Sequence, residues 1–164
     1  MISKTMQDAI NAQVAAEQHS SQLYLAMSAH CEGKSFKGFA HWLRVQSGEE
    51  MAHALKLVSF LLDRGGKLEL APVAAPRGDF GGITQVFEHT LAHEKENTAR
   101  INALFALSRA EKDYASELAL QWYVNEQVEE EATVSQIVSH LRAVGEQGGG
   151  IWYLDSRMAK RGKE

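Results

Sequence analysis

The sequence predicts an all-α fold: a four-helix bundle with one long crossover and a short C-terminal fifth helix. Both prolines, Pro72 and Pro76, and most of the mid-chain glycines fall within residues 64–82, so the chain on either side is free to form helices. On both sides of this segment apolar residues recur at spacings of three and four, which is typical of helices packed in a bundle. The expected long helices cover residues 5–33, 35–63, 83–110 and 113–143.

The first two helices are separated only by the short break Gly33-Lys34-Ser35. The inward stripe of the first helix consists of Met6, Ile10, Gln13, Glu17, Ser20, Tyr24, Met27 and Cys31. The stripe of the second consists of Phe39, Leu43, Gln46, Glu50, His53, Leu57 and Phe60. Because so short a link leaves no room to cross the bundle, these two helices are expected to be antiparallel.

The third and fourth helices are likewise separated by a short break, Glu111-Lys112-Asp113. The third stripe consists of Ile83, Phe87, Thr90, Glu94, Asn97, Ile101, Leu104 and Ser108. The fourth consists of Leu120, Tyr123, Gln127, Glu130, Val134, Ile137, Leu141 and Val144. The crossover of about nineteen residues can span a helix at about 3.3 Å per residue, so the second and third helices should run parallel. A glycine cluster, GEQGGG, precedes a short amphipathic segment at 151–161.

Each stripe is mostly apolar at its ends and polar in its middle. The polar residues near the helix midpoints are Glu17, Glu50, His53, Glu94, Gln127 and Glu130. Side-by-side packing brings helix midpoints to one level whichever way each helix runs. These six residues should therefore form a single polar layer across the core.

Carboxylates in such a layer need a partner, because an isolated ionised acid in an apolar core is very costly. No lysine or arginine lies on the four stripes, so the cation available inside is a metal ion or a set of protons. Four carboxylates with one imidazole favour iron or manganese over thiolate-bound zinc or copper. Glu50 and His53 share one helical face and can bind one ion together. Two ions can be held if a carboxylate bridges them; a metal-free bundle acting as an interaction scaffold is the alternative.

Composition limits the classes of function. A chain of 164 residues and 18.1 kDa fits one domain, residues 1–164. The single cysteine, Cys31, excludes an intramolecular disulfide, and the N-terminus lacks a signal-peptide pattern, so a cytoplasmic protein is expected. The net charge of −4 without a broad basic surface argues against nucleic acid as a partner. The chain has no stretch of eighteen apolar residues, which argues against a membrane partner.

At these residues, and over nearly its whole length, the chain resembles the bacterial non-haem ferritins. The resemblance rests on Glu17 and Tyr24, on Glu49-Glu50-x-x-His53, on Glu94, and on Glu126-Gln127-x-Glu129-Glu130. It implies a ferritin-like di-iron domain with ferroxidase activity, in which Fe(II) is oxidised by O₂, or by H₂O₂, and stored as a ferric mineral. It also implies a homo-oligomer, a hollow shell of twenty-four copies.

The resemblance implies a role for each matched residue. One iron is expected at Glu17, Glu50 and His53, and the second at Glu50, Glu94 and Glu130, with Glu50 bridging. Gln127 would lie beside the pair, and Tyr24 would be close enough for hydrogen bonding and electron donation, although a buried tyrosine that merely needs a hydroxyl partner is the alternative. Glu49, Glu126 and Glu129 are each one residue before a polar-layer position, so they face about 100° away and would form a third, more exposed iron site. A solvated acidic face is the alternative for these three.

One departure separates this chain from related di-iron proteins. Bacterioferritins and rubrerythrins carry a second Glu-x-x-His on the fourth helix, where this chain has Gln127-Val128-Glu129-Glu130. Met51 matches the haem methionine of bacterioferritins, but a methionine on a bundle helix usually serves packing, so haem is not expected. The competing interpretation is a bacterioferritin- or rubrerythrin-like oxidase or peroxidase without storage. The rubrerythrin form is disfavoured because a Cys₄ module needs more than one cysteine.

Overall fold

The computed structural model describes residues 1–162 and confirms the predicted all-α class. The helices are α1 (Lys4–Gly33), α2 (Lys37–Asp63), α3 (Ile83–Ala110), α4 (Tyr114–Val144) and α5 (Gly149–Met158). The long helices begin and end within two residues of the predicted boundaries. None of the helices described over residues 1–162 has the length and apolar content needed to span a membrane.

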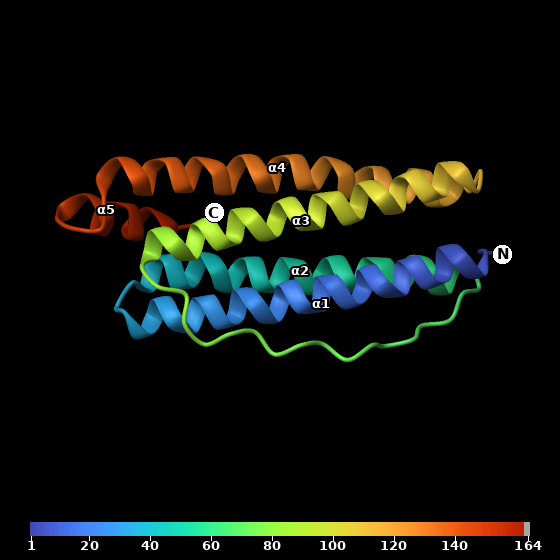
Figure 1. Cartoon of the computed structure of the whole chain (residues 1–164), viewed down its shortest axis with the longest axis horizontal. Coiled ribbons are helices and arrows are strands. Elements are labelled where there is room, and N and C mark those ends of the chain that lie inside the picture. The colour runs from blue at the N-terminus through green and yellow to red at the C-terminus, as the bar shows by residue number, and fades with distance from the viewer. Residues whose placement is uncertain (163–164) are drawn as a thin grey trace.

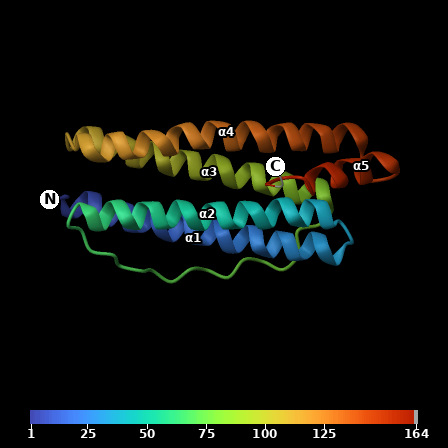
Figure 2. The same cartoon turned by 180° about the vertical axis from the view of Figure 1, so that it is seen from behind.

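The four long helices form the bundle with the predicted topology (Figure 1). α1 and α2 are antiparallel neighbours, as are α3 and α4, and α1 also packs against α3. The crossover, residues 64–82, runs the length of the bundle outside α1 and α2, so that α3 starts at the same end as α2 (Figure 2). Helix direction and midpoint position are therefore as the sequence predicts.

Local contacts explain where the helices begin. The Ser3 hydroxyl accepts a hydrogen bond from the Met6 amide at 3.0 Å and caps α1. The Asp113 carboxylate caps α4 by accepting from the Ser116 amide at 3.2 Å. The same carboxylate accepts from Arg64 at 2.9 Å, which fastens the start of the crossover to the start of α4.

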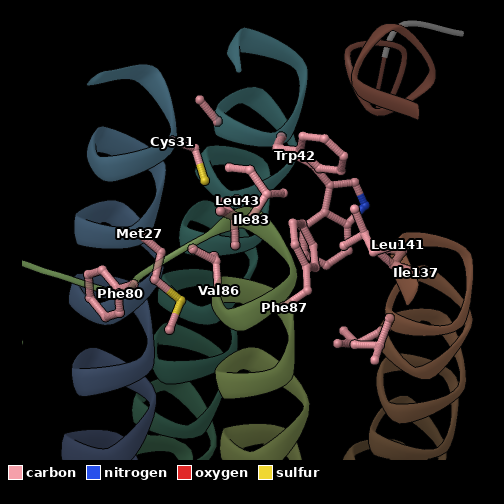
Figure 3. Close-up of a cluster of buried hydrophobic side chains, with 14 of the residues drawn as sticks. Met27, Cys31, Trp42, Leu43, Phe80, Ile83, Val86, Phe87, Ile137 and Leu141 are labelled. Atoms are coloured by element: carbon pink, nitrogen blue, oxygen red, sulfur yellow. The ribbon is translucent and has the colours of Figure 1, made fainter. Parts of the chain in front are cut away.

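Two apolar clusters fill the two ends of the bundle. The cluster near α5 contains large side chains from all five helices and from the crossover, among them Phe39, Trp42 and Phe87 (Figure 3). The other, at the end where the chain begins, includes Met6, Ile10, Leu57, Leu61, Ile101, Leu104 and Leu120. The predicted polar residues lie between these clusters, so burial of apolar surface on both sides fixes the level at which they meet.

α5 differs slightly from its prediction at 151–161, since it begins at Gly149 and ends at Met158. Gly145 and Gly148 form the predicted break, but Gly149 and Gly150 belong to the first turn of the helix, and burial of Ile151 and Leu154 holds it against the bundle. A Cβ at Gly38 would lie 1.7 Å from the Asp155 carbonyl oxygen, so α5 approaches α2 at a position only glycine allows. There the Asp155 carboxylate accepts from the Phe39 amide at 2.9 Å.

Gly38→Ala is expected to separate α5 from α2, because the added methyl group overlaps backbone atoms that cannot move independently. A loss of about 1–3 kcal/mol is typical for such overpacking. The matched control is Gly48→Ala on the same helix, where nothing lies within 4 Å of the added Cβ and alanine should stabilise by about 0.5–1 kcal/mol. Thermal denaturation of both variants measures the difference, and equal melting temperatures would refute the close α2–α5 contact.

Candidate metal centre

The polar layer exists as a buried set of side chains at the middle of the four long helices. Its six predicted members are all buried, and Glu17 and Glu50 are 0% exposed. α1 supplies Glu17, α2 supplies Glu50 and His53, and α3 supplies Glu94. α4 supplies the remaining two, Gln127 and Glu130. All six therefore come together as expected from their positions at the helix midpoints.

The possible ligand atoms form overlapping groups. Glu17, Glu50 and His53 form one group in which one atom from each lies within 4.8 Å of the others. Glu50, Glu94 and Glu130 form a second by the same measure. Because Glu50 belongs to both, its two oxygens can serve two neighbouring cations. A third group, which the sequence did not predict, joins His53 and Glu130 to Glu126 at the edge of the layer.

Side-chain amides hold the carboxylates from the sides. Gln13 donates to Glu17 Oε1 at 2.8 Å and also to Asn97 Oδ1 at 2.8 Å. Gln46 donates to Glu50 Oε1 at 2.7 Å and to Glu130 Oε1 at 2.8 Å. The sequence placed these three amides on the inward stripes but assigned them no role. Gln13 and Gln46 each precede a glutamate by four residues, a spacing that puts both on one helical face and could have identified them.

Tyr24, Gln127 and Tyr123 complete the hydrogen bonding around the layer. The fully buried Tyr24 hydroxyl donates to Glu94 Oε1, and Gln127 Nε2 donates to Glu94 Oε2 at 3.2 Å. The Tyr123 hydroxyl donates to the His53 backbone carbonyl at 2.8 Å, which fixes the turn that carries the imidazole. Tyr24 thus hydrogen-bonds to Glu94, one of the residues predicted to bind iron.

Two carboxylate oxygens in the layer lack hydrogen-bond donors. Glu50 Oε2 and Glu130 Oε2 are buried without a partner among residues 1–162. A buried acceptor without a donor costs free energy, and its occurrence in a native core calls for an explanation such as an ion. Hard oxygen ligands with one imidazole fit Fe(II), so the side chains present suit a divalent cation.

Burial raises the pKa of all four acids, and mutual repulsion adds to this at Glu50, Glu94 and Glu130. Burial, followed by the charges of Glu130, Glu94 and Glu17, raises the pKa of Glu50 well above its usual range. Burial and the charge of Glu94 raise the pKa of Glu130 to about 9. Burial likewise raises the pKa of Glu17 and of Glu94. His53 behaves oppositely, since burial and the nearby Lys56 lower its pKa to about 4, so that its imidazole is neutral at pH 7.

The three outer acids lie together in a separate, partly exposed pocket. We call this the acidic pocket; it has a volume of about 170 Å³ and is lined by Trp42, Gln46, Glu49, Glu126, Glu129, Glu130, Thr133, Val134 and Arg161. Burial and the charges of Glu129 and Glu49 raise the pKa of Glu126. Glu130 belongs to both the polar layer and this pocket, so the two sites are adjacent.

Arg161 is the feature of this region that the sequence did not predict. The stripes contain no cationic residue, yet this side chain from the C-terminal segment donates to Glu49 Oε2 and to Gln46 Oε1. A cation other than a metal ion therefore lies beside the polar layer, although it does not enter it. It was missed because it lies on none of the four stripes, and because the amphipathic segment predicted at 151–161 does not indicate where a side chain at its end will dock.

Comparison with known proteins identifies relatives over almost the full chain. The ferritin-like domain family matches residues 7–144. The bacterial non-heme ferritin of Bacteroides fragilis is 41% identical over 161 residues, covering 98% of this chain and 100% of that protein. The bacterial non-heme ferritin of Staphylococcus aureus is 34% identical, covering 98% of this chain and 97% of that protein. Among solved structures, an open-pore ferritin from Archaeoglobus fulgidus matches with a TM-score of 0.97 and 41% identity, covering 98% of this chain and 99% of that one.

Proposed function

Since this chain belongs to the ferritin family, we propose that it stores iron and oxidises Fe(II) with O₂ at the polar layer. The observation that carries this proposal is the pair of ligand groups sharing Glu50. Two Fe(II) ions held side by side can each give one electron to the same O₂ molecule. The resulting Fe(III) then leaves the layer and accumulates as mineral.

The proposed ligands divide by helix. Glu17, Glu50 and His53 bind the first Fe(II), and Glu50, Glu94 and Glu130 bind the second, as the two groups suggest. Glu50 bridges the ions, and a bridging carboxylate can change its binding mode as the iron charge rises. Neutral His53 supplies a nitrogen ligand without first losing a proton.

Tyr24, Gln127 and the supporting amides position these ligands. Tyr24 and Gln127 hold the two oxygens of Glu94, while Gln46 holds one oxygen each of Glu50 and Glu130. The other oxygen of each of these two, Glu50 Oε2 and Glu130 Oε2, accepts no hydrogen bond from residues 1–162. Both oxygens are therefore available to an ion. These hydrogen bonds reduce the reorganisation needed when iron binds.

A third Fe(II) site is proposed in the acidic pocket. Glu49, Glu126 and Glu129 line the pocket, and Glu130 connects it with the polar layer. Glu126 can approach His53 and Glu130 closely enough to share a cation with them. Iron can therefore pass between the layer and the pocket without leaving carboxylate ligands.

Storage requires an enclosed space, and we propose a homo-oligomeric shell of twenty-four copies. The long helices leave several large apolar side chains exposed, which a monomer would expose to water and an interface would bury. They are Leu25, Leu55, Leu62, Tyr114, Leu118 and Val128. Identical chains that bury such surfaces against one another commonly form closed symmetric assemblies.

Aerobic loading with excess Fe(II), followed by size-exclusion chromatography, tests storage. Protein and a large molar excess of iron should elute together in a particle far larger than the 18.1 kDa chain. A matched run under argon controls for adsorbed Fe(II). Elution of the protein with only a few irons per chain would contradict storage and favour a di-iron oxidase that keeps no mineral.

Fe(II) binding at pH 7 should release protons, because the raised carboxyl pKa values keep protons in the layer until a cation replaces them. Affinity should therefore increase as pH rises from about 6 toward 9, the direction set by the Glu130 pKa of about 9. The same shifts affect the stability of the apo protein. The contribution of these acids to the free energy of unfolding is fully present below their unfolded pKa of 4.5, and it is lost as pH rises through their raised pKa values in the folded protein. Anaerobic calorimetry in two buffers of different ionisation enthalpy measures the release; identical heats would refute it.

A further inference from the structure

The C-terminal segment returns to the bundle and is fastened there by Arg161. After α5 the chain runs back toward the middle of the bundle (Figure 2). The His41 Nε2 atom lies 2.9 Å from the Arg161 backbone carbonyl, and the guanidinium lies 4.1 Å from the Trp42 ring centre. The Nη1 atom of Arg161 donates to the Trp42 backbone carbonyl at 3.3 Å. Backbone and side chain are therefore both held against α2.

The guanidinium lies at the acidic pocket and contacts one of its acids directly. Nη2 donates to Glu49 Oε2 and to Gln46 Oε1, the latter at 2.8 Å. The Arg161 side chain is 22% exposed and that of Glu49 45%, so water screens this pair only in part. Among the described residues that line the pocket, Arg161 is the only cationic one, against four glutamates.

Gln46 connects this cation with the polar layer. Its amide oxygen accepts from Arg161, and its amide nitrogen donates to Glu50 Oε1 and Glu130 Oε1. An amide has a donor end and an acceptor end, so a cation at the oxygen turns the nitrogen toward the carboxylates. Arg161 is thus a positioning residue for the inner ligands as well as a counter-ion for the outer ones.

We propose that Arg161 is a tethered cation that occupies the acidic pocket in the iron-free protein, and that a third Fe(II) must displace it from Glu49 to bind there. This inference rests on the proposed third iron site. The pocket then has two states: in one the C-terminal segment is closed over it, and in the other iron is bound and the segment is released.

Competition follows from the shared carboxylate. A guanidinium hydrogen-bonded to Glu49 and an Fe(II) ion at the same carboxylate repel each other across a pocket of about 170 Å³. The coupling is reciprocal, because a ligand that weakens the binding of a second is weakened equally by it. The tether makes the arginine a permanent competitor whose effective concentration is set by the short chain after α5.

Anaerobic Fe(II) titration calorimetry tests the competition. Arg161→Gln should bind the third Fe(II) per chain about fivefold or more tightly than the unaltered protein, a typical size for coupling between sites. Arg161→Lys keeps the charge without the planar fork and should give an intermediate affinity. Lys160→Gln is the matched control: it removes one exposed positive charge from the neighbouring residue and should leave the third affinity unchanged.

Hydrogen exchange of the unaltered protein tests release of the segment without any substitution. The Lys160 and Arg161 amides donate to the carbonyls of Arg157 and Met158, so their exchange reports on the closed turn. Exchange in the C-terminal peptide should increase between two and three Fe(II) per chain. Exchange in this peptide should remain constant between zero and two Fe(II) per chain.

The two measurements separate failure of this inference from failure of the proposed function. Equal third-iron affinity in Arg161→Gln and the unaltered protein, or constant exchange of the C-terminal peptide at every loading, would overturn the competition. In that case two Fe(II) would still bind at the polar layer. If the polar layer bound no Fe(II), the proposed function itself would be refuted.

Discussion

Glu130→Ala should abolish the rapid oxidation of the first two Fe(II) ions per chain. The carboxylate is buried, belongs to the second ligand group and has one oxygen without a donor among residues 1–162. Its removal takes away a ligand and leaves the Gln46 amide with one acceptor fewer. Loss of a supporting group around a metal typically lowers metal affinity or activity 10–100-fold, so loss of a ligand should lower the oxidation rate about 100-fold or more. Stopped-flow oxidation at two Fe(II) per chain measures it.

Variants of the acidic pocket provide the matched comparison. Glu49→Ala, or Glu126→Ala combined with Glu129→Ala, should retain most of the rapid phase, because these acids line the acidic pocket and belong to neither of the two ligand groups that share Glu50. They should reduce Fe(II) bound per chain from three toward two and alter the iron oxidised per O₂. If Glu49→Ala removes the rapid phase as completely as Glu130→Ala, the division into an inner pair and an outer site is wrong.

Glu50→Gln should have two opposite effects: loss of rapid iron oxidation and a more stable apo protein. The substitution keeps the shape but removes the only ligand common to both groups, so neither ion keeps its full set. At the same time it removes a carboxyl group whose ionisation is disfavoured by burial and by three neighbouring acids. The new amide can also donate toward those acids. Stabilisation on the order of 1 kcal/mol at pH 8 is expected, the usual net contribution of a buried hydrogen bond.

Thermal denaturation of the apo protein at two pH values distinguishes this explanation from a general packing effect. The advantage of Glu50→Gln over the unaltered protein should be larger at pH 8 than at pH 5, where protons already neutralise the native acids. Anaerobic Fe(II) should raise the melting temperature of the unaltered protein much more than that of the variant. A variant less stable than the parent at both pH values would contradict the repulsion.

The sequence predicts the bundle and its polar layer because both depend on periodicity. Helical spacing assigns Glu17, Glu94 and Glu130 to inward stripes without any knowledge of their partners. Their position halfway along each helix is preserved by parallel and antiparallel packing alike. The two apolar clusters at the ends then fix the level of the layer. The residues proposed to bind iron therefore follow from the sequence, although their iron-binding roles stay a prediction.

The supporting contacts do not follow from periodicity, because they depend on side-chain directions across helices. A stripe shows that Gln46 faces inward, but not that its amide joins Glu50 to Glu130. Arg161 is less predictable still, since it follows the last helix. Its position depends on how α5 docks, and that depends on a contact between Gly38 and Asp155 over a hundred residues apart in the chain.

Anomalous X-ray diffraction at the iron absorption edge, from crystals loaded anaerobically with Fe(II), tests the two-iron centre most directly. Two peaks are expected in the polar layer, about 3.5–4 Å apart as in other two-metal sites. One should lie among Glu17, Glu50 and His53, and the other among Glu50, Glu94 and Glu130, with Glu50 touching both. Iron peaks only at the protein surface, or a single ion that Glu50 does not contact, would contradict the centre.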